Sequence, residues 1–262
     1  QLVEDAIPFA IKLYESLLAQ NPDHQGLILT TGSLFVMYAN AFVQGPAEML
    51  PVDRVDDYYA ATARAKKLYI RGADIILSGL DKKYPGWKDA AENETLDQYL
   101  GKTKKEDVPA LYWTVAGLLS AYSMDVFDFE LGMRLPELTA MIKRAYELDP
   151  DFNRGALDEF FILFYSSIPE GLGGDPSMVE PHFQKAVEKS GGLSAGPYVS
   201  YAQSVCRPAQ DYKSFKEYLE KALAIDVDAD PANRLVNVLA QKKARYLLDT
   251  ASDIFLVGAE DE

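Results

Sequence analysis

The feature that most constrains this chain is a short phrase that recurs at the ends of predicted helices. It occurs at residues 144–149, 185–190 and 221–226, and its alanines, Ala145, Ala186 and Ala222, lie 41 and 36 residues apart. Turn residues and a new apolar segment follow each copy. A repeated pair of helices cannot bury its apolar face alone, so it must stack on its neighbours. The spacing therefore predicts an all-α fold of stacked helix pairs.

Repeats of this length are typical of tetratricopeptide-like units, which are helix hairpins of roughly 34 residues. We expect an α-solenoid of degenerate tetratricopeptide-like helix pairs that forms one helical domain over residues 1–262. An apolar content of 48% is sufficient for a packed core. The net charge of −14 argues against nucleic acid as a partner, because phosphate contacts need clustered Lys and Arg. The concave surface of such a solenoid favours binding over catalysis.

Apolar periodicity and proline positions predict about ten helices. Pro22, Pro150 and Pro231 each follow Asn or Asp where one helix ends and the next begins. Asp175 is expected to cap a helix that has Pro176 at its first position. We interpret residues 84–106, rich in Gly, Asn, Asp and Lys, as a long surface excursion. The predicted helices span residues 5–20, 24–44, 54–83, 107–126, 136–148, 153–167, 176–190, 195–206, 211–225 and 231–257.

Three stretches contain no Asp, Glu, Lys or Arg. They cover residues 25–47, 108–124 and 160–169. The first is long enough to cross a membrane, which needs about 20 apolar residues. It contains several hydroxyl and amide side chains, however, and has no basic flank. A helix buried inside the fold is therefore the favoured interpretation, because a helix that is apolar on all sides belongs in a core.

Residues capable of catalysis or metal binding are sparse. His24 and His182 are the only histidines and fall in different repeats, so we expect no metal site and no catalytic triad. Cys206 stands beside Arg207, which can activate a thiol, but no base is expected near it. The glycine-rich residues 171–175 follow a helix rather than a strand, which excludes a phosphate-binding loop. The sequence predicts neither an enzyme nor a bound cofactor.

The charge-free helices are rich in aromatic and hydroxyl residues. A solid core would favour Leu, Ile and Val, whereas this composition also suits the wall of an apolar pocket or channel. The sequence leaves both interpretations open. The residues that we select as ligand contacts are Tyr38, Asn40, Phe42, Tyr112, Trp113, Ser120 and Phe164.

Four segments along the chain resemble the T component of TRAP transporters. They occur in order and span almost the whole sequence. They are Tyr38-Ala39-Asn40-Ala41-Phe42-Val43-Gln44 with Ala47-Glu48; Leu111-Tyr112-Trp113; Gly173-Gly174-Asp175-Pro176 with His182-Phe183-x-Lys185-Ala186; and Arg234-Leu235-x-Asn237-x-Leu239-Ala240 with Ala244-x-x-Leu247-Leu248.

The resemblance implies a periplasmic helical protein that engages the substrate-binding P subunit of a TRAP system. It also implies a homotrimer and an internal passage suited to a hydrophobic or amphipathic molecule. Members are often lipid-anchored. The cysteine that would carry the lipid is not in this chain, so we expect the anchor on a preceding N-terminal segment.

Two functions from different classes follow. In the first, the protein docks the P subunit and helps relay a hydrophobic solute. In the second, it is a generic tetratricopeptide-like scaffold that binds a protein or peptide, and the charge-free helices are solid core. A hydrolase has only the acidic surface in its favour.

Overall fold

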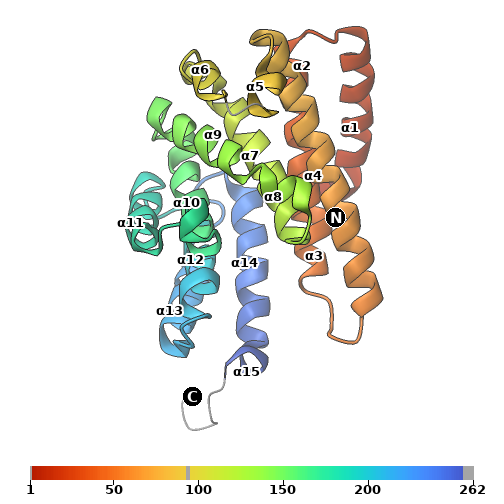
Figure 1. The fold of residues 1–262 in the computed structure, drawn as a ribbon. Coiled ribbons are helices and arrows are strands. Elements are labelled where there is room, and N and C mark those ends of the chain that lie inside the picture. Colours follow the sequence, from red (N-terminus) through yellow and green to blue (C-terminus); the bar gives the residue numbers. More distant parts are fainter. Residues whose placement is uncertain (1, 93–94, 256–262) are drawn as a thin grey trace. The chain divides into compact units, whose positions relative to one another are not determined.

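The chain folds into helices and their connections. The computed structural model describes residues 2–92 and 95–255, and these contain no strand. They form two compact units, residues 1–149 and 150–262 (Figure 1). The expectation of an all-α fold is confirmed. The tetratricopeptide-like solenoid and the single domain over residues 1–262 stay predictions.

The first unit is a row of long helices in which each packs on the next. α1 packs on α2, α2 on α4, α4 on α7 and α7 on α9 (Figure 1). Short elements connect them. The elements are α1 (Leu2–Gln20), α2 (Gln25–Ala39), the π-helical turn η1 (Asn40–Gln44), α3 (Gly45–Ala47), α4 (Val55–Lys83), α5 (Trp87–Glu92), α6 (Asp97–Leu100), η2 (Lys105–Asp107), α7 (Val108–Met124), α8 (Phe129–Met133) and α9 (Leu135–Leu148).

The second unit continues the pattern of helix on helix. α10 packs on α11 and α12, α12 on α13, and α13 on α14. Its elements are η3 (Phe152–Arg154), α10 (Ala156–Ser167), η4 (Glu170–Leu172), η5 (Pro176–Met178), α11 (Val179–Lys189), α12 (Gly196–Tyr201), the π-helical turn η6 (Ala202–Cys206), α13 (Tyr212–Ala224), α14 (Arg234–Asp249) and α15 (Ala251–Ile254).

The repeated phrase marks helix ends, as the sequence predicts. Ala145, Ala186 and Ala222 lie in the last turns of α9, α11 and α13, and all three are buried. A small side chain at that position lets another element approach closely. The repeated phrase therefore marks a helix end where a small buried side chain permits close packing.

The segment 84–106 is not the surface excursion that its composition suggests. It contains α5 and α6, and its Trp87 is fully buried together with Leu96 and Leu100. Arg144 of α9 holds it in place, with Nε donating to the Leu100 carbonyl at 3.1 Å and Nη2 to the Thr103 carbonyl at 3.1 Å. The composition does not predict this packing, because the buried residues Trp87, Leu96 and Leu100 are widely spaced among polar ones.

Among the described residues, each unit has a π-helical turn with a proline two residues after it. The Gly45 amide donates to the Asn40 carbonyl and the Arg207 amide to the Ala202 carbonyl, both five residues back. Pro46 and Pro208 follow. Because a proline ring clashes with the carbonyl four residues earlier, the regular α-helical ladder cannot continue through it. The wider turn relieves this conflict, and π turns often occur at functional positions.

Residues 25–47 form a helical segment that is long and apolar enough to cross a membrane by length and composition. In the first unit it packs against α1 and α4. At Gly32, a Cβ would come within 2.6 Å of the Gly72 carbonyl oxygen, so the two helices approach at backbone distance. This close packing accords with the predicted buried helix.

Candidate functional site

Six of the seven predicted ligand contacts lie in the first unit. Tyr38, Asn40 and Phe42 come from α2 and η1, and Tyr112, Trp113 and Ser120 come from α7. Asn40 is exposed and the other five are half-buried. The seventh, Phe164, lies in α10 of the second unit and is buried.

Asn40 and Ser120 meet at the hydroxyl of Tyr69, which comes from α4 and is fully buried. That hydroxyl donates to Gln44 Oε1, and Gln44 Nε2 donates to Glu48 Oε1 at 2.7 Å. Both ends of the Gln44 amide therefore have partners, which fixes its orientation. We call Tyr69, Asn40, Gln44 and Ser120 the Tyr69 cluster. It joins η1, α4 and α7.

The environment of Tyr69 keeps its hydroxyl protonated. Burial raises the pKa of Tyr69 well above its usual value, and the interactions with Asn40 and Ser120 offset this only in part. The nearby carboxylate of Glu48 raises it further. A neutral phenol of this kind is a fixed hydrogen-bond donor. It therefore stays protonated at neutral pH.

Aromatic side chains flank the Tyr69 cluster along two helices. The rings of Tyr38 and Phe42 have centroids 6.0 Å apart, and Arg64 Nη2 donates to the Tyr38 hydroxyl at 3.3 Å. On α7, Trp113 lies seven residues before Ser120, which places both on the same face about 10 Å apart. Tyr112 packs edge-on against Trp113 at 5.1 Å.

Around Tyr69, side chains and backbone fill the space between α2, α4 and α7. A Cβ on Gly117 would lie 3.1 Å from the Tyr69 carbonyl oxygen and 3.1 Å from Val36 Cγ2. Helices in such contact leave no room for a ligand between their axes. A ligand that touches the predicted residues would therefore lie against their half-buried outer faces.

Phe164 belongs to a separate aromatic cluster. It stacks on Phe160 at 6.1 Å and packs edge-on against Phe161 at 5.9 Å. Phe161 and Tyr165 cover the ring of His182, with centroids 4.8 and 5.4 Å away. This cluster is internal to the second unit.

His182 lies inside α11, within the helix predicted at residues 176–190, and it is paired with a buried carboxylate. Its Nδ1 is 2.7 Å from Asp158 Oδ1, and Lys189 Nζ is 2.8 Å from Asp158 Oδ2. Lys189 also donates to the Pro150 carbonyl at 2.6 Å. A carboxylate and imidazole buried under two aromatic rings form a clasp between residues 150–158 and α11.

Cys206 ends the π-helical turn η6 and is buried. Burial, with a smaller contribution from Asp211, raises the pKa of its thiol to about 11. The thiolate is the reactive form, so the raised pKa and the burial both disfavour reaction of this side chain at neutral pH. The adjacent Arg207 does not activate it. Among the described residues, no three His, Cys, Asp or Glu side chains gather as metal ligands would.

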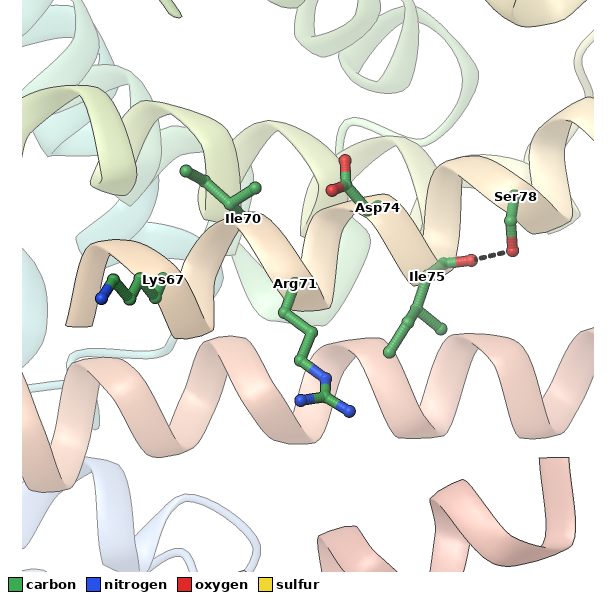
Figure 2. A pocket seen from close by; sticks show the side chains of 6 residues that line it. All are labelled: Lys67, Ile70, Arg71, Asp74, Ile75 and Ser78. Atoms are coloured by element: carbon green, nitrogen blue, oxygen red, sulfur yellow. Dashed lines mark hydrogen bonds between the residues drawn. The ribbon is translucent and has the colours of Figure 1, made fainter. Parts of the chain in front are cut away.

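An open groove of about 500 Å³ runs along α4 and contains none of the predicted contacts (Figure 2). In Figure 2, Ile70 and Asp74 point to one side of the helix, whereas Arg71 and Ile75 point to the other. Arg71 pairs with Glu15 of α1 and lies over the Phe35 ring, 5.0 Å from its centroid. Side chains that diverge from one helix do not form a convergent binding site.

Tyr69 and Glu159 are not among the residues that the sequence predicts for the site. Tyr69 lies on the apolar face of α4, where it looks like an ordinary core residue. Glu159 follows Asp158 in the first turn of α10, where an acid is usually a surface residue. It is half-buried, its carboxylate packs against Gly196, and burial raises its pKa to about 7. No local signal distinguishes Tyr69 from other core residues of α4, because its partners come from η1 and α7.

Two comparisons with known proteins bear on the family. The sequence model of the TRAP transporter T-component family matches residues 1–255. An uncharacterized protein of Treponema pallidum (strain Nichols) is 36% identical over 258 residues, which covers 97% of this chain and 80% of that protein. Together with the all-helical fold, these matches show that the chain belongs to the T-component family of TRAP transporters.

Proposed function

We propose that this protein is a periplasmic, non-enzymatic accessory component that docks the solute-binding P protein of a TRAP system and helps relay a hydrophobic or amphipathic solute. Membership of the T-component family supports an accessory role in TRAP transport. One observation carries the solute-binding part. The uncharged helical segments of the first unit present half-buried aromatic faces around the hydrogen-bonding Tyr69 cluster.

The chemistry of these faces suits contact with a mostly apolar molecule. Trp113, Tyr38 and Phe42 would desolvate the apolar part, while Asn40 and Ser120 would bind a polar end. Burying about 300 Å² of ligand at roughly 25 cal/mol/Å² contributes about 7 kcal/mol before ordering costs. Affinity in the micromolar range at best follows after those costs, which suits a relay that must release its ligand.

Among the reactive groups of the described chain, Tyr69, Cys206 and His182 fit a role without catalysis. The Tyr69 phenol and the Cys206 thiol both have raised pKa values, so neither ionises readily at neutral pH. The His182–Asp158 pair is buried and serves as a clasp. The remaining parts of the proposal derive from the family resemblance. They are a homotrimer, a tetratricopeptide-like solenoid, a periplasmic location and a lipid anchor.

A scaffold without a small-molecule ligand is the second candidate function. The close approach of Gly32 to the Gly72 backbone favours it, because no passage remains between α2 and α4 where these two glycines meet. In this alternative the aromatic faces would be packing surfaces for a protein or peptide.

Replacing Trp113 by Ala tests the solute-binding part. The probe is an apolar fluorophore, N-phenyl-1-naphthylamine, titrated into the purified protein. We expect Trp113→Ala to weaken binding about tenfold, because a truncated aromatic anchor commonly costs more than 1 kcal/mol. Tyr69→Phe removes the buried hydroxyl that Asn40 and Ser120 contact, and should weaken binding of a hydroxyl-bearing analogue through these two residues but not of the apolar probe.

The matched control is Phe9→Ala, which removes an exposed aromatic residue of α1. It should leave the titration unchanged. Equal binding by wild type and Trp113→Ala, with both folded by circular dichroism, would remove the support for a ligand at this face.

A further inference from the structure

The hydrogen bonds of the Tyr69 cluster form a chain that begins at the carboxylate of Glu48. A carboxylate has no proton to donate, so Glu48 can only accept. Gln44 Nε2 donates to Glu48 Oε1 at 2.7 Å, which leaves Gln44 Oε1 as the acceptor for Tyr69. The Tyr69 hydroxyl donates to that oxygen. The single proton of the phenol is therefore used within the chain.

The direction of this chain continues to Asn40 and Ser120. Both side chains are hydrogen-bonded to the Tyr69 hydroxyl, whose oxygen has only lone pairs left to offer. Asn40 must therefore donate through Nδ2, and Ser120 must donate its hydroxyl proton. Both interactions lower the pKa of Tyr69, as donors to a phenol oxygen do, because they stabilise the phenolate.

Asn40 and Ser120 therefore keep mainly acceptor capacity for a ligand. Asn40 retains Oδ1 and one N–H, whereas Ser120 retains only oxygen lone pairs. Within residues 2–92 and 95–255, neither side chain has a hydrogen-bond partner other than Tyr69. Asn40 is exposed and Ser120 is half-buried, so a ligand can reach both. A polar group that donates satisfies more of these atoms than one that only accepts.

The charge beside the cluster favours the same kind of ligand. The carboxylate of Glu48 lies close enough to raise the pKa of Tyr69, so the polar end of the site has a negative potential. Lys66, one turn before Tyr69 on α4, does not offset it. Its Nζ lies 2.8 Å from Asp125 Oδ2 and 2.7 Å from Asp128 Oδ2, so two carboxylates surround this cation.

Arg64 is a second cation of α4, and it lies on the aromatic flank of the site. Its Nη2 donates to the Tyr38 hydroxyl at 3.3 Å, and its guanidinium carbon is 5.8 Å from the centroid of the Tyr38 ring. Tyr38 and Asn40 are two residues apart, and residues at that spacing do not face the same side of a helix. Arg64 is therefore not aligned with the acceptors of Asn40.

From this polarity we infer that the solute of the proposed relay is an amphiphile whose polar end donates hydrogen bonds and carries no negative charge. An alcohol and a primary ammonium are the two simplest examples. A carboxylate end would meet mostly acceptors and the charge of Glu48, which disfavours it. The inference rests on the solute-binding half of the proposed function and names its substrate class. Glu48 is a positioning residue, because it sets the direction of the chain without touching the ligand.

The test is displacement of N-phenyl-1-naphthylamine from the purified full chain by four ligands of nine carbons. They are 1-nonanol, octyl methyl ether, nonylamine and nonanoate. We expect 1-nonanol to displace the probe at a concentration about fivefold lower than octyl methyl ether, which has the same heavy atoms but no donor. In about 150 mM salt, which screens the net charge of the chain, nonylamine should bind at least about tenfold more tightly than nonanoate.

Glu48→Gln tests the direction of the chain separately from its packing. The substituted amide can donate to Gln44 as well as accept, so the chain can reverse and leave Asn40 with more donor capacity. Both preferences should fall below about threefold, while affinity for the probe stays within about twofold. The matched control is Glu188→Gln, which removes the same charge from an exposed residue of α11. It should keep both wild-type preferences.

The contrary outcomes are distinct. If wild type binds octyl methyl ether as tightly as 1-nonanol, or nonanoate as tightly as nonylamine, the inference is overturned and the relay stands. If wild type binds neither the probe nor any of the four ligands, the proposed function itself is contradicted. Wild-type preferences that persist in a folded Glu48→Gln protein would show that Glu48 does not set the polarity, and would also overturn the inference.

Discussion

At the scale of single residues, Gly174 fixes the connection between α10 and α11. A Cβ at this position would overlap the Ile168 carbonyl oxygen, which is backbone and has little freedom to move. We expect Gly174→Ala to destabilise the second unit by about 2 kcal/mol or more, as overpacked sites do. Urea denaturation monitored by circular dichroism measures the effect.

Gly171 provides the control for this substitution. It lies in the same connection, and no atom lies within 4 Å of its added Cβ. Gly171→Ala should leave the denaturation midpoint nearly unchanged. Equal midpoints for the two variants would show that Gly174 is not required for steric reasons.

Glu159 makes stability depend on pH. Its pKa is raised by burial from 4.5 to about 7, so the folded state holds this proton more tightly than the unfolded state. Stability from this group is therefore greatest below about pH 4.5 and is lost as the pH rises through 7. Relative to Glu159→Gln, the wild type should lose about 1–3 kcal/mol across that interval. Urea midpoints at about pH 5 and pH 8 test this, and a parallel change in both proteins would contradict it.

At the scale of elements, the contact between α2 and α4 depends on glycine. A Cβ on Gly32 would lie 2.6 Å from the Gly72 carbonyl oxygen and would also overlap Ile76. Gly32→Ala should push the helices apart and lower the free energy of unfolding by about 2 kcal/mol. Thermal unfolding followed by circular dichroism at 222 nm is the measurement.

Gly132→Ala is the comparison for that variant. Its nearest atom would be 3.6 Å away in the Tyr122 ring, which is ordinary contact. It should unfold near the wild-type temperature. A Gly32→Ala protein as stable as the Gly132→Ala protein would mean that the two helices can separate without cost.

The sequence predicts most helices because their signals are local. Asp175 caps the helix containing Pro176 as expected, with Oδ1 accepting from the Ser177 amide at 3.1 Å. The predicted helix at 54–83 corresponds to α4 at 55–83. The burial of Trp87 could not be predicted, because it depends on contacts distant in sequence. The π-helical turn at Asn40–Gln44 was also missed, although Pro46 inside a helical pattern is its local cause.

The candidate site was predictable only in part. Asn40 and Ser120 were selected for their polarity, and the structure brings them to one hydroxyl. That hydroxyl belongs to Tyr69 of α4, and its partners lie on two other elements, η1 and α7. Their meeting depends on contacts that are distant in sequence. Phe164 was grouped with them on composition alone, and it lies in the second unit.

At the scale of the whole molecule, the chain is a T-component family member whose described residues form two helical units. In the first unit, the Tyr69 cluster and its aromatic neighbours offer contact without reactive groups. In the second, a buried ionic clasp and an aromatic cluster stabilise the packing. The candidate contacts of the first unit therefore fit the proposal that the protein works by binding.

Native mass spectrometry of gently purified protein tests this account most directly. The relay function predicts a mass excess from an apolar or amphipathic molecule, and the Trp113→Ala protein should carry less of it. A wild-type protein whose mass matches the bare chain, with no ligand gained after incubation with apolar solutes, would contradict the relay and favour the scaffold.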